Sequence, residues 1–198
     1  MKLLNQKLIL ASASPRRKEL FDLLELEYSV VPSGVKEEFL PGLSARDHAL
    51  GHSRSKAVSV SARFPLSWVV GADTIVVVDG KPLGKPRSRE EAVKMLKELS
   101  GKTHNVITGY AVAREGRIAA DGAVSSEVVF RAIPDEEMEW YVSTGEPFDK
   151  AGGYAVQGAG AFFIEEIRGS YTNVIGLPLS EVIGVLKSLG VIRFEAGG

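Results

Sequence analysis

Several residues have types and spacing that could bind and cleave a charged substrate. The run from Ser12 to Arg17 reads Ser-Ala-Ser-Pro-Arg-Arg, follows a short apolar segment and begins a predicted helix. Free N–H groups at a helix start favour an anion, and hydroxyls and paired guanidiniums can grip phosphate oxygens. Arginines in the first helical turn oppose the helix dipole unless an anion compensates. The run therefore indicates a phosphate site, and a capped helix with solvated arginines is the alternative.

A carboxylate, Asp73, lies inside the apolar stretch from Val69 to Val78. A buried, unpaired carboxylate costs several kcal/mol, so Asp73 must have a partner, a metal ion or a cleft. The alternative is a strand that ends at Ala72, with Asp73 capping a turn. The apolar run that follows Thr74 argues against that alternative, and we expect a functional carboxylate.

Basic and amide side chains elsewhere could complete such a site. Lys56 lies in a predicted helix, and Lys85 lies in a Gly-Lys-Pro loop. Lone lysines are usually solvated, but near Asp73 they would be charge partners for a polyphosphate. Gln157, in a glycine-rich run, offers an amide donor and acceptor that can pair with a nucleobase edge. A polar residue in a glycine turn is the alternative interpretation of Gln157.

Composition excludes several functional classes. The chain has 198 residues and no cysteine, which excludes disulfides, thiol nucleophiles and thiolate zinc sites. Its 24 basic and 25 acidic residues are balanced, which argues against nucleic-acid binding. No Walker A sequence is present, so a P-loop NTPase is excluded. The longest uncharged run, residues 151–164, is shorter than the roughly 18 residues of a membrane span, so we expect a soluble, cytoplasmic protein without membrane or nucleic-acid partners.

Periodicity and turn residues predict alternating strands and helices in an α/β fold with a mixed sheet. The predicted strands are 8–10, 28–31, 68–78, 105–113, 117–120 and 125–133. The predicted helices begin at Pro15, Ala45, Asp135, Leu179 and directly after Ser88, which starts a capping box. The stretch 68–78 is apolar on both faces, which predicts a strand covered on both sides. The glycine-rich segment 145–176 predicts close backbone approaches or tight turns, and the tail from Glu195 is expected to fray.

Taken together, these stretches resemble the Maf family, septum-formation proteins regarded as nucleoside triphosphate pyrophosphatases. The resemblance extends from Leu8 to about Leu189. Its motifs are residues 12–17, 56–57, 71–74, 84–86, 103–109, 146–158 and 169–178. One departure occurs after the second predicted strand, where the family often has Asp-Glu and this chain has Lys36-Glu37.

The resemblance implies one domain over residues 1–198, with a mixed twisted sheet, flanking helices and two lobes around a central cleft, as in the related inosine-triphosphate pyrophosphatases. It implies hydrolysis between the α- and β-phosphates of a nucleoside triphosphate with Mg²⁺ or Mn²⁺, and a homodimer. Asp73 takes the catalytic acidic position, and Glu37 and Asp73 are the candidate metal ligands. The residues that match phosphate-binding positions are Ser12, Arg16, Arg17, Lys56 and Lys85.

Substrate choice within the family is implied by a few side chains. Arg16, Thr74 and Gln157 match positions of the subgroup that prefers dTTP and UTP, and CTP is expected to be a weaker substrate. The alternatives are hydrolysis of 7-methyl-GTP or another modified purine triphosphate, and a nucleotide sensor in septum control without turnover. Asp73 either acts as a general base or holds the metal that acidifies the attacking water. Both roles, and a possible part in cell-division arrest, stay open.

Overall fold

The computed structural model describes residues 1–195 and is built on a mixed sheet with flanking helices. Its strands are β1 (Lys2–Leu3), β2 (Lys7–Leu10), β3 (Ser29–Val30), β4 (Ser67–Val78), β5 (Lys81–Leu83), β6 (Thr103–Arg114), β7 (Arg117–Phe130), β8 (Ile164–Arg168) and β9 (Ile192–Arg193). Its α-helices are α1 (Pro15–Asp22), α2 (Ala45–Arg63), α3 (Arg89–Leu99), α4 (Asp135–Ser143), α5 (Tyr171–Ile175) and α6 (Leu179–Ser188). Of the tail that is expected to fray from Glu195, residues 196–198 lie outside the described part.

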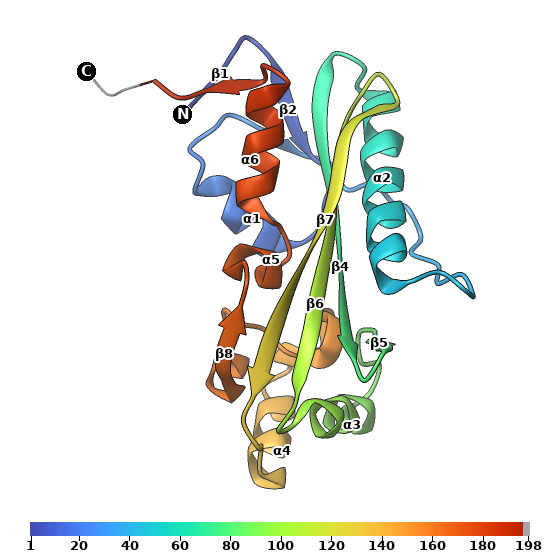
Figure 1. Cartoon of the computed structure of the whole chain (residues 1–198), viewed down its shortest axis with the longest axis vertical. Coiled ribbons are helices and arrows are strands. Elements are labelled where there is room, and N and C mark those ends of the chain that lie inside the picture. The colour runs from blue at the N-terminus through green and yellow to red at the C-terminus, as the bar shows by residue number, and fades with distance from the viewer. Residues whose placement is uncertain (196–198) are drawn as a thin grey trace. The chain divides into compact units, whose positions relative to one another are not determined.

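The larger sheet combines parallel and antiparallel pairs. Its strand order is β3-β2-β4-β6-β7-β8, and β5 pairs with β4. β2 is parallel to both of its neighbours, whereas β5 is antiparallel to β4 and β8 is antiparallel to β7. A separate small sheet pairs β1 with β9, which lie side by side near the two ends of the chain (Figure 1). The predicted α/β class with a mixed sheet is confirmed.

The chain divides into two compact units. Unit 1 comprises residues 1–73, 108–124 and 176–198, and unit 2 comprises residues 74–107 and 125–175. The long strands β4, β6 and β7 contribute residues to both units. In unit 1, α2 packs through Ala57 and Val60, which are fully buried. Unit 2 has its own core, in which Leu96 and Leu99 of α3 pack with Phe130, Tyr141 and Phe163.

Local sequence signals explain the helix starts. Ser88 caps α3, because its hydroxyl accepts a hydrogen bond from the backbone N–H of Glu91 at 3.2 Å. Ser44 caps α2 in the same way, through the N–H of Asp47 at 3.1 Å. Ser14 occupies the N-cap position of α1, but its side chain makes no capping bond. Its backbone N–H instead donates to Ser12 Oγ at 3.1 Å, so the start of α1 is arranged around Ser12.

The strand prediction was wrong after residue 120. The separate strands expected at 117–120 and 125–133 form one strand, β7, which ends at Phe130. Asp121 and Gly122 resemble a turn in sequence, but the Asp121 carboxylate accepts from Arg54 Nε at 2.6 Å within unit 1. A Cβ at Gly122 would lie 2.6 Å from the hydroxyl of Tyr110, so this glycine allows a close side-chain approach instead of a turn.

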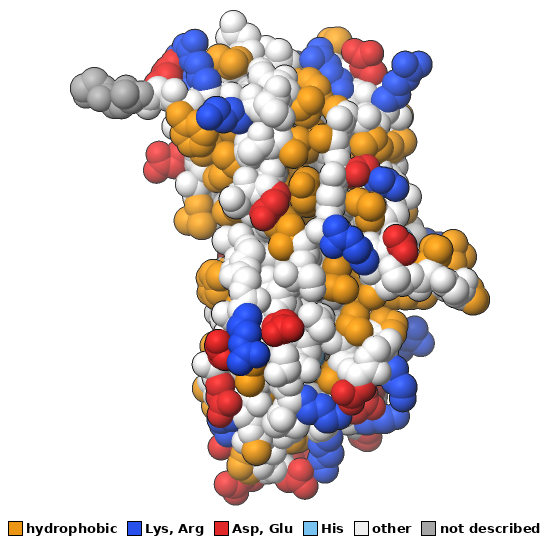
Figure 2. Space-filling view, in the orientation of Figure 1, with side chains coloured by type: hydrophobic (Ala, Val, Ile, Leu, Met, Phe, Trp, Pro, Cys, Tyr) orange, Lys and Arg blue, Asp and Glu red, His pale blue; other side chains and the backbone are white. Residues whose placement is uncertain are grey.

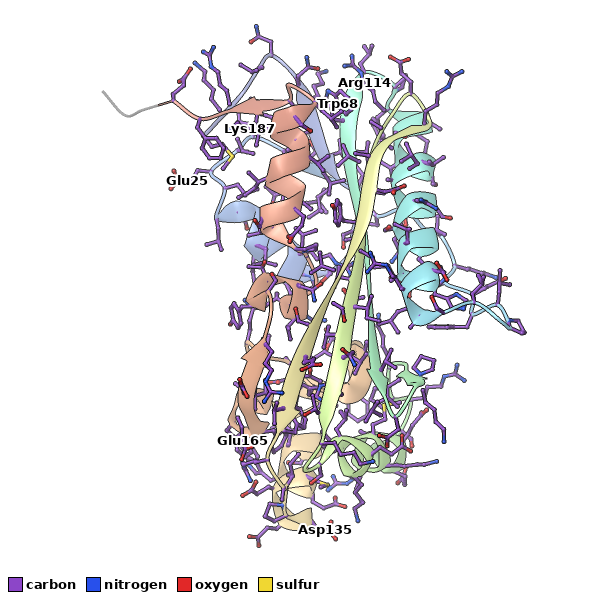
Figure 3. All side chains as sticks on the ribbon, viewed as in Figure 1. Glu25, Trp68, Arg114, Asp135, Glu165 and Lys187 are labelled. Carbon is purple, nitrogen blue, oxygen red and sulfur yellow. The ribbon has the colours of Figure 1, made fainter. Side chains whose placement is uncertain are left out.

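The remaining expectations agree with the structure in most places. β4 is buried along most of its length on both faces, as predicted. Near its start, the ring of Trp68 lies 5.3 Å from the guanidinium carbon of Arg114 (Figure 3), a cation–π contact within unit 1. The glycine-rich segment contains three short 3₁₀-helices, at residues 146–149, 151–153 and 159–163, before β8. The sequence patterns did not predict β1, β5, β8, β9 or α5.

Candidate active site

Asp73 lies in the middle of β4 and is almost completely buried, with a side chain 7% exposed. Both of its carboxylate oxygens are held by α2. Lys56 Nζ donates to Oδ1 at 2.7 Å, and His52 Nδ1 lies 3.0 Å from Oδ2. The sequence predicts a partner, a metal ion or a cleft for this carboxylate, and the structure shows two partners. The two donors offset the cost of burying the charge and fix the direction of both oxygens.

His52 and Lys56 reach Asp73 because they lie four residues apart on one face of α2. Lys56 Nζ also donates to Glu37 Oε1 at 2.6 Å, so two carboxylates share one buried ammonium. The second ring nitrogen of His52 lies 3.0 Å from the backbone carbonyl oxygen of Glu38. The carboxylate and the carbonyl are both acceptors, so the ring donates at both nitrogens when the two bonds form together.

The start of α1 carries a second group of polar side chains in unit 1. The guanidinium of Arg17 is buried, donates from Nε to the carbonyl oxygen of Gly176 at 2.7 Å and contacts Ser12 Oγ at 3.4 Å. Burial lowers the pKa of Arg17, whereas the charges of Asp73 and Glu37 act in the opposite direction. A buried cation at a helix N-terminus, next to a hydroxyl, is an arrangement that accommodates an anion.

The other predicted site residues are distributed over the two units. Arg16 is half-buried on α1 in unit 1. Thr74, Lys85 and Gln157 belong to unit 2. Thr74 follows Asp73 in β4 and is half-buried, Lys85 is exposed in the segment between β5 and α3, and Gln157 is exposed in a turn. Within unit 1, the structure brings Asp73, Lys56 and Glu37 together and, separately, joins Ser12 to Arg17.

The carboxylates of Glu37 and Asp73 have the donor chemistry that a hard divalent cation requires. They converge on Lys56 Nζ, at 2.6 and 2.7 Å, so oxygen ligands from both residues already face one positive charge. Among residues 1–195, no cluster of three His, Cys, Asp or Glu side chains could hold a metal ion. Mg²⁺ is commonly held by one or two carboxylates, with substrate phosphates and waters supplying the rest. The donor set therefore fits a metal that binds together with a polyphosphate.

The residue that the sequence analysis missed is His52. No role was predicted for this histidine from the sequence. The available signal was the four-residue spacing of His48, His52 and Lys56, which predicts a common helix face. That spacing does not say what the face contacts, so the pairing of His52 with Asp73 could not be inferred.

The chain matches the family described as Maf-like protein over residues 7–189. It is 52% identical to "dTTP/UTP pyrophosphatase" of Syntrophus aciditrophicus over 98% of this chain and 95% of that protein. It is 49% identical to the protein of the same name from Geobacter sulfurreducens, over 94% of this chain and 98% of the relative. A third protein of that name, from Pyrococcus horikoshii, is 49% identical over 91% of this chain and 95% of its own length.

Among solved structures, the fold is similar to that of a HAM1 protein from Coxiella burnetii. The TM-score is 0.53 at 16% identity, over 92% of this chain and 99% of the other. This likeness concerns the fold alone. Within residues 1–195, no helix is both long and apolar enough to cross a membrane.

Proposed function

This chain belongs to the family of Maf-like proteins, and on that premise we propose that it is a nucleoside triphosphate pyrophosphatase that acts on dTTP and UTP. Water attacks between the α- and β-phosphates, and the products are the nucleoside monophosphate and pyrophosphate. The observation that carries this proposal is the 52% identity, over 98% of the chain, to a relative with that name. The family match includes residues of both units, which supports residues 1–198 acting as one catalytic domain.

We assign Asp73 to the activation of the attacking water. Its carboxylate accepts the proton of the water directly, or it holds the divalent metal that makes that proton more acidic. The burial of Asp73 supports this role, because a carboxylate in a dry environment interacts strongly with a neighbouring proton or cation. The bonds from Lys56 and His52 keep the carboxylate oriented before substrate arrives.

We assign Ser12, Arg16, Arg17, Lys56 and Lys85 to the triphosphate. Attack at phosphorus is opposed by the negative charge of the phosphates, so positioning and charge neutralisation provide most of the catalysis. The buried guanidinium of Arg17 supports this assignment, because an anion beside it offsets the cost of its burial. The role of Lys85, in unit 2, rests on the match to the family motif.

We assign base selection to Arg16, Thr74 and Gln157. An amide such as that of Gln157 can pair with the O4 and N3 atoms of uracil or thymine. Cytosine reverses the donor and acceptor at that edge, and a mispaired amide costs about 1–3 kcal/mol, so CTP is expected to react more slowly. These assignments rest on the family positions, and the exposed turn that carries Gln157 leaves its amide accessible.

Mg²⁺ or Mn²⁺ is the cofactor that we propose, with Glu37 and Asp73 as the residues that would hold it. When bound, such an ion neutralises phosphate charge and acidifies water. The two carboxylates that converge on Lys56 support this choice. We further propose that the enzyme acts in the cytoplasm as a homodimer, and that nucleotide-pool cleaning and arrest of division are its candidate roles.

The test is pyrophosphate release from dTTP, UTP, CTP, ATP, GTP and 7-methyl-GTP, with Mg²⁺ or Mn²⁺. We expect dTTP and UTP to be the best substrates, and Asp73→Asn to abolish turnover while binding of the triphosphate is retained. The matched control is Asp22→Asn, which removes an exposed carboxylate of unit 1 that pairs with Lys18 at 2.7 Å. We expect that variant to keep wild-type turnover.

Each other outcome changes a defined part of the proposal. Full activity of Asp73→Asn would refute the catalytic assignment. Turnover of 7-methyl-GTP alone would refute the roles given to Thr74 and Gln157 and would leave the centre at Asp73 intact. Tight binding of every triphosphate without hydrolysis would identify a nucleotide sensor instead of an enzyme.

A further inference from the structure

A row of side chains on helix α2 bonds to an exposed part of the preceding loop. His48, His52 and Lys56 lie at four-residue spacing and face residues 37–40, called here the 37–40 segment. His48 Nε2 lies 3.1 Å from the carbonyl oxygen of Leu40, and His52 Nε2 lies 3.0 Å from that of Glu38. Lys56 adds the ion pair with Glu37. Figure 1 shows this loop beside the N-terminal half of α2.

His52 connects the backbone of this segment to Asp73, whereas Lys56 connects the Glu37 side chain to it. His52 Nδ1 lies 3.0 Å from Asp73 Oδ2, and the His52 side chain is 11% exposed. Lys56 holds the other oxygen of the same carboxylate, so rotation of the Asp73 carboxylate would break both contacts. The 37–40 segment is itself exposed, and the bonds from His48 and His52 tie its backbone to α2 next to Glu37.

We infer that His52 is a positioning residue of the proposed active site. Through Nδ1 it orients the carboxylate of Asp73, and through Nε2 it holds the 37–40 segment so that Glu37 stays beside Lys56. This inference rests on the proposed function, because the orientation of Asp73 affects catalysis only if Asp73 activates the attacking water. It adds to that function a residue that contacts neither phosphate nor base in the assignments above.

The competing explanation is simple packing. The ring of Phe39 lies 4.8 Å from that of His48 and 5.8 Å from that of His52, measured between centroids. Figure 2 shows hydrophobic side chains gathered over this loop, and its exposed apolar residues are Phe39, Leu40 and Leu43. If packing were the whole role of His52, another aromatic ring would replace it.

Amide side chains can separate the two hydrogen bonds of His52. The amide nitrogen of asparagine occupies the place of Nδ1, and that of glutamine reaches the place of Nε2. His52→Asn therefore keeps the bond to Asp73 and loses the bond to Glu38. His52→Gln does the reverse, and His52→Phe keeps only the ring.

The experiment measures kcat and KM for dTTP and, separately, the rate of tryptic cleavage after Lys36, next to the 37–40 segment. We expect His52→Phe to lower kcat by about 10- to 100-fold, the usual effect of removing a residue that orients a catalytic ligand. His52→Asn should recover most of kcat but be cleaved faster than the wild type. His52→Gln should resist trypsin like the wild type and keep the low kcat.

The matched control is His48→Phe, one helical turn away, which loses a bond to the same loop but has no contact with Asp73. We expect faster cleavage and an unchanged kcat. A kcat of His52→Phe within twofold of wild type would overturn the inference. Equal impairment of the Asn, Gln and Phe variants in both measurements would also overturn it, because it would show a role in packing alone.

A third measurement keeps the inference testable if the wild type hydrolyses no triphosphate and the proposed function fails. The unfolding equilibrium constant is measured for His52→Phe, Asp73→Asn and the double variant. Residues in direct contact are expected to couple, here by about 10-fold. Additive effects within twofold would refute the contact with Asp73, whereas wild-type resistance of His52→Phe to trypsin would refute the hold on the loop.

Discussion

Replacing Lys56 by Met tests the electrostatics of the candidate site most directly. The substitution removes the ammonium that lies 2.7 Å from Asp73 and 2.6 Å from Glu37, and it keeps most of the side-chain volume. The side chains of Lys56 and Asp73 are 8% and 7% exposed, so the Asp73 carboxylate would remain buried with His52 as its partner. Breaking a buried ion pair costs about 3–5 kcal/mol. The remaining bond to His52 places the expected loss near the lower limit, about 3 kcal/mol.

The matched comparison is Glu37→Gln. This substitution breaks an ion pair of nearly the same length, but the Glu37 side chain is 45% exposed. Solvent screens such a pair, and we expect a loss of about 0–1 kcal/mol. The two ion pairs of Lys56 therefore have nearly the same N–O distance, but the Asp73 carboxylate is buried and the Glu37 carboxylate is exposed.

The assay is urea unfolding in the presence of a chelator, because a divalent cation could replace the missing ammonium. The chain has two tryptophans, and Trp68 lies in unit 1 whereas Trp140 lies in unit 2. A Trp140→Phe background therefore makes fluorescence report unit 1, where Lys56 lies. At this chain length about 3 kcal/mol corresponds to a drop in Tm of about 6–12 °C.

Two results would refute this reasoning. One is an unfolding free energy of Lys56→Met within about 1 kcal/mol of wild type, the loss expected of an exposed pair. The other is an equal loss for Lys56→Met and Glu37→Gln. Adding Asp73→Asn to Lys56→Met should recover part of the stability, since the uncompensated charge is then gone.

Three further predictions concern stability. Burial lowers the pKa of His104 to about 4, so below about pH 6.5 the unfolded chain binds a proton that the folded chain does not bind. The free energy of unfolding should therefore fall by about 3 kcal/mol as the pH drops from about 6.5 to 4. Urea unfolding across this pH range should show a smaller pH dependence for His104→Gln. Gly109→Ala should lower the free energy of unfolding by about 1–3 kcal/mol, because its Cβ would lie 2.3 Å from the carbonyl oxygen of Ala49. Gly51→Ala in α2, whose Cβ would have nothing within 4 Å, should raise it by about 0.5–1 kcal/mol in the same measurement. Ser88→Ala should lower the free energy of unfolding, measured by thermal unfolding, by about 1 kcal/mol, and Ser14→Ala should leave it almost unchanged. Of these two serines, Ser88 alone caps its helix with its side chain.

Much of the fold followed from short-range signals in the chain. The apolar run around Asp73 predicted β4, and the capping box at Ser88 predicted the start of α3, because these patterns act over one strand or one helical turn. They failed at Asp121 and Gly122, where an ion pair to Arg54 and the approach of Tyr110 outweigh the local turn preference. Such contacts join residues far apart in the chain, and local patterns carry no information about them.

The same division applies to the candidate site. That Asp73 needs a partner follows from the cost of a carboxylate in an apolar strand, a property of residue types and spacing. The packing of α2 against β4 determines which groups pair with Asp73. It brings Lys56 and His52, which was not predicted, to the two carboxylate oxygens. Helical spacing places those two side chains on one face, but only the folded chain determines what that face meets. The physical reason is that burial and pairing depend on contacts between segments, whereas periodicity depends on neighbours along the chain.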